Sequence, residues 1–277
     1  MYNLSDIKTI RSIINKHGFN FKKSMGQNFL TDGSVCPAMA EHCAGRNVLE
    51  IGPGIGVLTV QLSACAKKVV SVELDRSLEK ILSDTLSHTH NVTVVYGDAM
   101  KLDLKNLLSE HFGDEPVTVC ANLPYNITSP IIMMLLEGGF NIEQMVLMIQ
   151  KEAAERICAP VGSRDAGAIT VSVAMMAERS ILFHVGRECY MPQPNVDSAV
   201  IKLEILDKPP VLPKDMIKFK SIVKAGFSQR RKTLRNSLSS IADKEVLTKA
   251  LEKSGISPTA RIEELSLEDL CNLSDNL

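Results

Sequence analysis

The sequence contains no tryptophan, only four tyrosines, and no apolar run of the roughly 18 residues that a membrane-spanning helix needs. Its N-terminus, MYNLSDIKTI, lacks the basic-then-apolar order of a secretory signal. The seven cysteines are odd in number and form no C-x-x-C pair, which argues against a disulfide framework or a zinc site. We therefore expect a cytoplasmic protein without a membrane partner or a metal.

The net charge of −1 conceals an uneven distribution of charged residues. Residues 1–31 carry five basic and one acidic side chain, residues 32–207 carry 13 and 22, and residues 208–277 carry 13 and 9. The stretch from Lys218 to Arg235 holds seven basic residues and no acidic one. Such a run is typical either of a solvated helix face or of a surface that binds a polyanion.

Short β-branched runs alternate with longer amphipathic stretches from residue 46 onward, which indicates βαβ units. We expect strands at 47–51, 68–73, 92–96, 117–121, 144–149, 180–185 and 197–205. The last two are joined by a proline-rich loop too short for a crossover helix, so they should pair antiparallel. The fold class predicted is α/β, a doubly wound Rossmann-like sheet of about seven strands.

Three segments are expected along the chain. Residues 1–31 form a basic lead-in, and residues 32–207 form the catalytic domain. The linker Asp207-Lys208-Pro209-Pro210 opens residues 208–277, where the strand pattern stops. Helical spacing at 215–225 and 244–254 predicts a small, all-helical C-terminal domain.

A glycine loop follows the first expected strand, in the sequence Glu50-Ile51-Gly52-Pro53-Gly54-Ile55-Gly56. Glycines at this point let the backbone approach a ligand, and Glu73 at the end of the second strand is placed to bind ribose hydroxyls. The spacing is G-x-G-x-G, because Val57 stands where a dinucleotide fingerprint has its third glycine. A nucleotide-containing ligand other than a dinucleotide is indicated.

The charge of Glu50 selects among such ligands. A carboxylate at the mouth of the loop would repel a pyrophosphate by about 1–4 kcal/mol per close charge pair. It would attract S-adenosylmethionine, which carries a sulfonium and an ammonium group. We therefore expect S-adenosylmethionine as the cofactor, held in part by Glu50, Gly52 and Gly54.

Asp98 and Asn122 extend the series of polar residues at strand ends. Asp98 follows the third expected strand and can accept a hydrogen bond from an adenine amino group, although alone it would be an ordinary turn residue. Asn122 follows the fourth strand. Because the carboxyl ends of parallel strands form one edge of a sheet, these side chains should meet the glycine loop and Glu73 at a ligand site.

Asn122-Leu123-Pro124-Tyr125 suits chemistry on an exocyclic adenine amine, whose lone pair is delocalised into the ring. The Asn122 oxygen and a neighbouring backbone carbonyl can accept both amino hydrogens and draw the nitrogen toward a pyramidal geometry. Pro124 would fix the direction of the carbonyl, and Tyr125 would stack on the base. The alternative is a strand-ending turn with a half-buried tyrosine.

Seven ordered motifs resemble the KsgA/RsmA ribosomal RNA adenine dimethyltransferases. They are Gln27-Asn28-Phe29-Leu30, Glu50-Ile51-Gly52-Pro53-Gly54, Val72-Glu73-Leu74-Asp75, Gly97-Asp98-Ala99, Asn122-Leu123-Pro124-Tyr125, Pro192-Gln193-Pro194-Asn195-Val196-Asp197-Ser198-Ala199 and Gln229-Arg230-Arg231-Lys232-Thr233-Leu234-Arg235-Asn236. The resemblance implies dimethylation of N6 on two adjacent adenosines in a hairpin loop near the 3′ end of small-subunit ribosomal RNA. The protein would act as a monomer on the immature 30S subunit, late in its biogenesis.

The resemblance also assigns roles to residues. It places Asn28, Leu30 and Gly52 against the cofactor, Glu73 on its ribose, Asp98 on its adenine and Asn122 between cofactor and target base. Tyr190 stands where the family usually has phenylalanine as the second aromatic wall of the base pocket. The basic residues Arg230, Arg231, Lys232 and Arg235 are expected to contact RNA phosphates.

Three other functions are alternatives to this one. A relative that methylates 23S ribosomal RNA and confers antibiotic resistance more often reads N-I-P-Y/F, and a DNA adenine methyltransferase usually has a second proline where Leu123 stands. A non-catalytic assembly factor on the same fold would be favoured by loss of Glu50, Glu73 or Asn122. All three are present.

Overall fold

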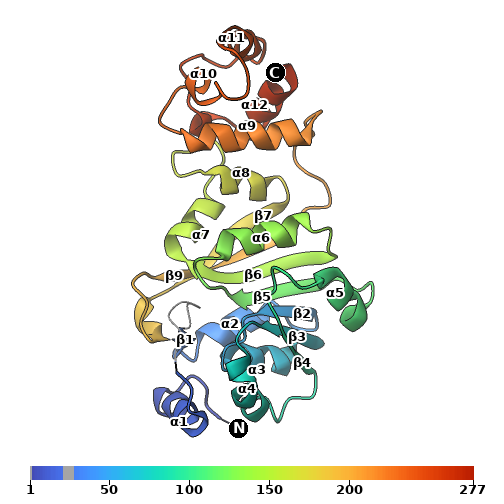
Figure 1. The fold of residues 1–277 in the computed structure, drawn as a ribbon, viewed down its shortest axis with the longest axis vertical. Coiled ribbons are helices and arrows are strands. Elements are labelled where there is room, and N and C mark those ends of the chain that lie inside the picture. The colour runs from blue at the N-terminus through green and yellow to red at the C-terminus, as the bar shows by residue number, and fades with distance from the viewer. Residues whose placement is uncertain (1, 21–27) are drawn as a thin grey trace. The chain divides into compact units, whose positions relative to one another are not determined.

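The computed structural model describes residues 2–20 and 28–277 (Figure 1). Gln27, which belongs to the first of the seven motifs, lies outside the described residues, as does the rest of segment 21–27. The chain divides into two compact units. The first contains residues up to 154 together with 180–204, and the second contains residues 155–179 and 205–277.

A seven-stranded sheet organises the first unit, in the order β4-β3-β2-β5-β6-β9-β7. Neighbouring strands from β4 to β6 are parallel, and β9 runs antiparallel to β6. All seven expected strands are confirmed, as is the antiparallel last strand. Their bounds are β2 Asn47–Ile51, β3 Lys68–Glu73, β4 Val92–Tyr96, β5 Val117–Asn122, β6 Ile142–Gln150, β7 Ala177–Val185 and β9 Ser198–Ile205.

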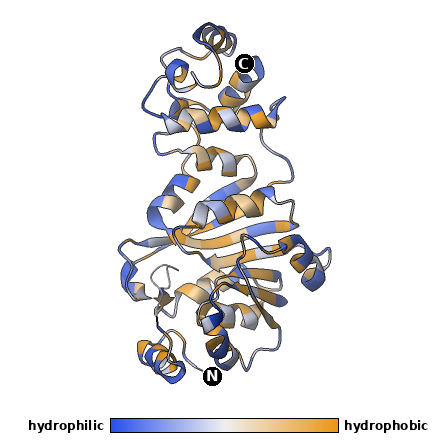
Figure 2. Ribbon diagram, in the orientation of Figure 1, coloured by the Kyte–Doolittle hydropathy of each residue, from blue (hydrophilic) through white to orange (hydrophobic). Residues whose placement is uncertain are grey.

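The central strands form where the sequence is rich in β-branched and apolar residues, because both faces of a parallel sheet are covered by helices. Every residue of β2 is buried, and Figure 2 shows β5 and β6 mostly in hydrophobic colours. The order changes direction at β2, from which the chain moves outward to β3 and β4 and then returns to β5. Open α/β sheets bind ligands at such a switch point, beyond the carboxyl ends of the strands.

Helices connect the strands of this unit, and several end at recognisable caps. The Asp6 side chain accepts a hydrogen bond from the Thr9 backbone at the start of α1, which ends at Gly18 with a φ of 62°. The helices α2 and α3 pack against each other, as do α1 and α4. The bounds are α1 Ile7–His17, α2 Val35–Glu41, α3 Val57–Cys65, η2 Arg76–Leu78, α4 Glu79–Thr85, α5 Leu104–Phe112, α6 Thr128–Glu137 and α7 Lys151–Cys158, the last of which runs into the second unit.

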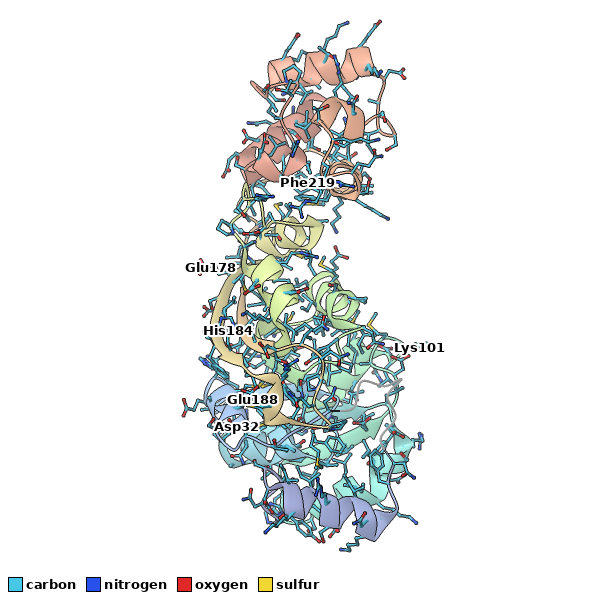
Figure 3. The ribbon with its side chains drawn as sticks, turned by 90° about the vertical axis from the view of Figure 1, so that its left-hand side faces the viewer. Asp32, Lys101, Glu178, His184, Glu188 and Phe219 are labelled. Carbon is cyan, nitrogen blue, oxygen red and sulfur yellow. The ribbon has the colours of Figure 1, made fainter. Side chains whose placement is uncertain are left out.

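A two-stranded antiparallel sheet, absent from the sequence-based expectations, joins two distant motifs. In it β1 (Phe29–Leu30) pairs with β8 (Tyr190–Met191), which follows η3 (Arg187–Cys189). Leu30 lies opposite Tyr190, and the Thr31 amide donates to the Cys189 carbonyl at 2.7 Å. Asp32 and Glu188, labelled in Figure 3, mark the two segments that this pairing brings together.

The second unit is helical, as expected for the C-terminal region, but it begins earlier than the sequence suggested. Residues 155–179, assigned from sequence to the catalytic domain, cluster with it because Val171 and Met175 belong to a hydrophobic core with Phe219 and Leu247. Its helices are α8 Ala168–Ala174, α9 Met216–Ser228, α10 Leu234–Ser237, α11 Lys244–Lys253, η4 Ile262–Glu264 and α12 Leu267–Asn276.

All seven cysteines lie in the described part of the chain and are free thiols. No helix among the described residues is both long and apolar enough to cross a bilayer. The same residues contain no group of three histidine, cysteine, aspartate or glutamate side chains placed to hold a metal ion.

Candidate cofactor and base-binding site

A cavity opens at the carboxyl ends of β2, β3, β4 and β5, the edge where the sequence placed a ligand site. The space between its lining residues is about 910 Å³, part of it open to solvent. The predicted site residues that line it are Asn28, Gly52, Gly54, Glu73, Asp98, Asn122, Leu123, Pro124, Tyr125 and Tyr190.

The glycine loop reaches the cavity with backbone angles that favour glycine. Gly52 has a φ of 73° and Gly54 a φ of 59°. The Gly54 amide donates to Glu73 Oε2 at 3.1 Å, which ties the first strand-end loop to the second. A Cβ atom on Gly54 would lie 3.3 Å from the ring of Phe29, so the loop and the N-terminal motif touch closely at this point.

Glu73 and Asp98 supply carboxylates at the cavity wall. Glu73 Oε1 accepts from the Asp75 amide at 2.7 Å, and burial raises the pKa of Glu73 while these backbone hydrogen bonds oppose the rise. Asp98 Oδ1 accepts from the Met100 amide at 3.0 Å, and Asp98 Oδ2 lies 3.5 Å from Lys101 Nζ. Each carboxylate thus shapes its own turn and keeps oxygen lone pairs for a ligand.

Glu50 occupies a different position from the one expected. Only 1% of it is exposed, and it is not among the residues that line the cavity. Its Oε2 accepts hydrogen bonds from Thr59 (2.8 Å) and Ser71 (2.6 Å). Burial raises the pKa of Glu50 to about 7, against the lowering effect of these two hydroxyls. Glu50 therefore stabilises the strand that leads into the glycine loop and does not face the cavity. Other carboxylates must attract a cationic ligand there.

The lining of the cavity fits S-adenosylmethionine. Among the described residues that line it there are two carboxylates, Glu73 and Asp98, and no lysine, arginine or histidine. A pyrophosphate would meet net negative charge in this lining, whereas a cationic ligand would be attracted. Apolar side chains, among them Ile51, Leu74 and Ala99, offer surfaces to an adenine ring and a thioether chain. Glu73 and Asp98 thus supply the negative charge that the sequence had assigned to residue 50.

Asn122 ends β5 at the cavity, and its side-chain amide forms no hydrogen bond with the described part of the protein. The Leu123 amide donates to the Met148 carbonyl at 3.0 Å, which anchors the turn to β6. The Pro124 carbonyl accepts from the Ile127 amide and from the Thr128 hydroxyl, both at 3.2 Å. Within the described residues the Leu123 carbonyl has no donor, so it is the better second acceptor for a base.

The two tyrosines that line the cavity share one partner. Tyr125 Oη lies 2.9 Å from Ser198 Oγ, and Tyr190 Oη lies 2.8 Å from the same atom. Tyr190 is buried, and burial raises its pKa and that of Tyr125, so both hydroxyls stay protonated near neutral pH. The structure thus brings Tyr190 to the same cavity as Tyr125, although 65 residues separate them.

Asn28 and Leu30 differ in their position. Asn28 lines the cavity, whereas Leu30 is buried next to it and lies opposite Tyr190 in the two-stranded sheet. A direct contact of Leu30 with the cofactor stays a prediction. The structure shows an indirect connection between Leu30 and the cavity, because Leu30 pairs with the backbone of Tyr190, which lines the cavity.

The basic segment lies in the second unit and divides into paired and unpaired side chains. Arg230 Nε donates to Glu263 at 2.9 Å, and its NH2 group donates to the Arg164 carbonyl at 2.6 Å. The other three predicted RNA-contact residues are exposed, and their side chains form no hydrogen bond or ion pair with the described residues; they are Arg231, Lys232 and Arg235. RNA contact by this segment stays a prediction, and these three are its best candidates.

Some residues at the site were not singled out from the sequence. Thr59 and Ser71 hold the Glu50 carboxylate, and both are buried. Ser198, which contacts both tyrosines, lies inside a motif that carried the family resemblance but received no role. Only position in that motif could have pointed to Ser198, since a buried serine has no distinctive pattern.

Comparison with known proteins agrees with this geometry. The family model described as ribosomal RNA adenine dimethylase matches residues 18–277. Ribosomal RNA small subunit methyltransferase A of Bacillus licheniformis is 44% identical over 276 residues, covering 96% of this chain and 94% of that protein. The protein of the same name from Ligilactobacillus salivarius is 46% identical over 278 residues, covering 96% and 93%.

Solved structures show the same fold. A dimethyladenosine transferase from Plasmodium falciparum aligns with a TM-score of 0.71 at 26% identity, covering 87% of this chain and 94% of that one. The 23S rRNA methyltransferase ErmE aligns with a TM-score of 0.69 at 28% identity, covering 90% and 99%.

Proposed function

Because this chain belongs to the ribosomal RNA adenine dimethylase family, we propose that it uses S-adenosylmethionine to dimethylate N6 of two adjacent adenosines near the 3′ end of small-subunit ribosomal RNA. The observation that carries the proposal is the convergence of four strand ends on one cavity. That cavity combines a glycine loop, two carboxylates with no basic residue in the lining, and the Asn122–Tyr125 turn. The chain is a methyltransferase by family, and the chemistry of this lining supports S-adenosylmethionine as the cofactor and adenine as the base.

The residues present can activate an exocyclic amine. When bound, S-adenosylmethionine supplies an electrophilic methyl group. Glu73 would hold the ribose hydroxyls and Asp98 the adenine amino group of the cofactor, while Gly52 and Gly54 allow its close approach. The Asn122 side-chain oxygen and the Leu123 carbonyl would accept the two N6 hydrogens of the target. This removes the nitrogen lone pair from conjugation and aims it into the cavity.

Tyr125 completes the arrangement by stacking on the target base, an interaction worth about 1–3 kcal/mol. No strong general base is required, because N6 becomes acidic once it is alkylated and then loses its proton. Catalysis would rest on positioning and on electrostatic stabilisation. The target must be unpaired or flipped, which bases in an RNA loop achieve at little cost.

The substrate is assigned to the small subunit on the strength of the curated relatives. These are 41–46% identical over nearly the whole chain, against 28% for the 23S rRNA methyltransferase ErmE. Action on the immature 30S subunit in the cytoplasm, as a monomer, belongs to the same proposal. A purely non-catalytic role is disfavoured because Glu73 and Asn122 are both present and both line the cavity.

The direct test is mass spectrometry of small-subunit RNA from cells that lack the gene. We expect N6,N6-dimethyladenosine near the 3′ end to disappear and to return when the wild-type gene is restored. Dimethyladenosine at its normal level in the deletion strain would disprove the assignment of the substrate.

The role of the turn is tested by Asn122→Ala in the purified protein. Loss of one hydrogen-bond acceptor at the reacting atom should lower methyl transfer by about 100- to 1,000-fold, while affinity for S-adenosylmethionine, measured by calorimetry, changes little. The matched control is Asn126→Ala, since Asn126 is an exposed amide in the same turn and does not line the cavity. Near-normal turnover of the Asn122 variant would exclude the proposed role of its amide.

A further inference from the structure

Three hydroxyl groups and a thioether form a continuous chain beside the cavity. Ser198, the first residue of β9, is fully buried, and its Oγ lies within 2.9 Å of both Tyr125 Oη and Tyr190 Oη. Tyr190 Oη also lies 3.1 Å from Met148 Sδ. Met148 and Ser198 lie on neighbouring strands, β6 and β9, so the chain has a rigid base.

The direction of these hydrogen bonds follows from counting protons. A thioether sulfur can only accept, and each hydroxyl has one proton. Tyr190 Oη donates its one proton to Ser198 Oγ, so its contact with Met148 Sδ competes for the same proton. Ser198 keeps its own proton, which it can donate to Tyr125 Oη. Ser198 Oγ is thus the atom through which the hydroxyls of the two tyrosines are joined.

The two aromatic rings come from segments that lie far apart in the sequence. Tyr125 follows β5, whereas Tyr190 lies in β8, opposite Leu30 of β1. Both rings line the cavity while their hydroxyls meet at Ser198. The position of Ser198 therefore fixes the spacing of the two rings at their hydroxyl ends.

We propose that Ser198 is a positioning residue, which sets the spacing of Tyr125 and Tyr190 as the two walls against which the target adenine is held. This inference rests on the proposed function, because it takes adenine as the base between the rings. Ser198 itself does not line the cavity and has no direct contact with the reacting atoms. It acts only through the two tyrosines.

The spacing matters most for the second methyl transfer to each adenine. The unmodified amine offers two hydrogens to the Asn122 oxygen and the Leu123 carbonyl. After the first transfer N6 keeps only one hydrogen, so one of these two hydrogen bonds is lost. Placement of the monomethylated base then depends more on contact with the aromatic walls, and a loosened wall slows the second transfer more than the first.

Two variants test the proposal, each assayed with unmethylated small subunits and S-adenosylmethionine. Ser198→Ala removes the shared atom, and Tyr125→Phe removes one hydroxyl while keeping the ring. We expect each to lower kcat about three- to tenfold with little change in KM, the size expected for loss of one or two neutral hydrogen bonds. The double variant should be no worse than Ser198→Ala alone, because Ser198→Ala already removes the link that Tyr125→Phe removes.

The ratio of products is the decisive measurement. At equal total methylation, both variants should accumulate a higher ratio of N6-methyladenosine to N6,N6-dimethyladenosine than the wild type. A smaller fraction of folded protein lowers the rate but leaves this ratio unchanged. The matched controls are Ser274→Ala, a buried serine without a hydrogen-bond partner among the described residues, and Tyr96→Phe, outside the cavity lining.

The possible outcomes separate this inference from the proposed function. If the wild type forms no dimethyladenosine, the proposed function fails. If the wild type forms it and both variants keep the wild-type product ratio and kcat, the function stands and the role of Ser198 is disproved. Additive losses in the double variant would also overturn it, since they would show that the two groups act separately.

Discussion

Replacement of Glu50 by glutamine should make the stability of the protein less dependent on pH. Glu50 is buried in β2, with Oε2 bonded to Thr59 and Ser71 and Oε1 buried without a partner among the described residues. Burial raises its pKa from the ordinary value of 4.5 to about 7. The folded state therefore binds a proton that the unfolded state releases, over the range between these two pKa values.

The sign and the size of the pH effect on stability follow from the difference between the folded and unfolded pKa of Glu50. A raised pKa contributes stability that is fully present below the unfolded pKa and is lost as the pH rises through the folded pKa. The full effect is about 3 kcal/mol, from 1.36 kcal/mol per pKa unit. Most of it, about 2–3 kcal/mol, is lost between pH 5 and pH 8. Glutamine cannot ionise, so Glu50→Gln should lack this part of the pH dependence.

The assay is urea unfolding of both proteins at pH 5 and pH 8. Only the change between the two pH values is compared, because the glutamine amide also introduces a constant, pH-independent cost in the buried site. Glu41→Gln is the control, since Glu41 is an exposed carboxylate at the end of α2 and should leave the slope unchanged. If wild type and Glu50→Gln lose the same free energy of unfolding between pH 5 and pH 8, the carboxyl is not protonated in the folded state and the reasoning is wrong.

Two further predictions concern the second unit. Alanine at its three exposed, unpaired cations should weaken RNA binding and reduce the slope of log affinity against log salt by about 0.7–0.9 for each phosphate that is no longer neutralised; these cations are Arg231, Lys232 and Arg235. Equal loss of charge on α11, by alanine at Lys244, Lys249 and Lys253, should leave that slope unchanged, and identical slopes for the two triple variants would argue against a specific contact. Gly226→Ala should destabilise the protein by about 1–3 kcal/mol in thermal unfolding, because the added Cβ would lie 2.6 Å from Ile262. Gly33→Ala, where the nearest atom is 3.7 Å away, serves as its control, and equal stability of both would show that α9 and η4 adjust freely.

The strands could be predicted closely from the sequence because each carries its own signal. The run Lys68–Glu73 contains three valines, is bounded by turn residues and is almost entirely buried. Its local sequence pattern and its buried position in the fold therefore both favour a strand. The two-residue strands Phe29–Leu30 and Tyr190–Met191 have no such pattern, because their pairing is purely long-range. The early start of the second unit was missed for the same reason, since Val171 and Met175 join its core through contacts distant in sequence.

The site was predicted best where residues lie just beyond a strand, and less well inside one. Gly52, Asp98 and Tyr125 all follow strand ends and all line the cavity. Glu50 lies one residue before the end of β2, and inside a parallel sheet a side chain faces a covering helix, here α3 through Thr59. Glu50 lies only two positions before Gly52, which lines the cavity. Its carboxyl is nevertheless buried, and burial raises its pKa to about 7.

The sequence also could not show which of the basic residues in segment 230–235 are paired with other groups in the fold. The sequence supplies four neighbouring cations at Arg230, Arg231, Lys232 and Arg235, and nothing in their spacing distinguishes them. In the folded unit Arg230 is bonded to Glu263, 33 residues further along the chain, and so has less capacity for a phosphate. Net charge predicts that the segment attracts RNA, since long-range attraction depends on the sum of charges. Which side chains are free to contact a phosphate depends on pairing, and pairing is decided by the fold.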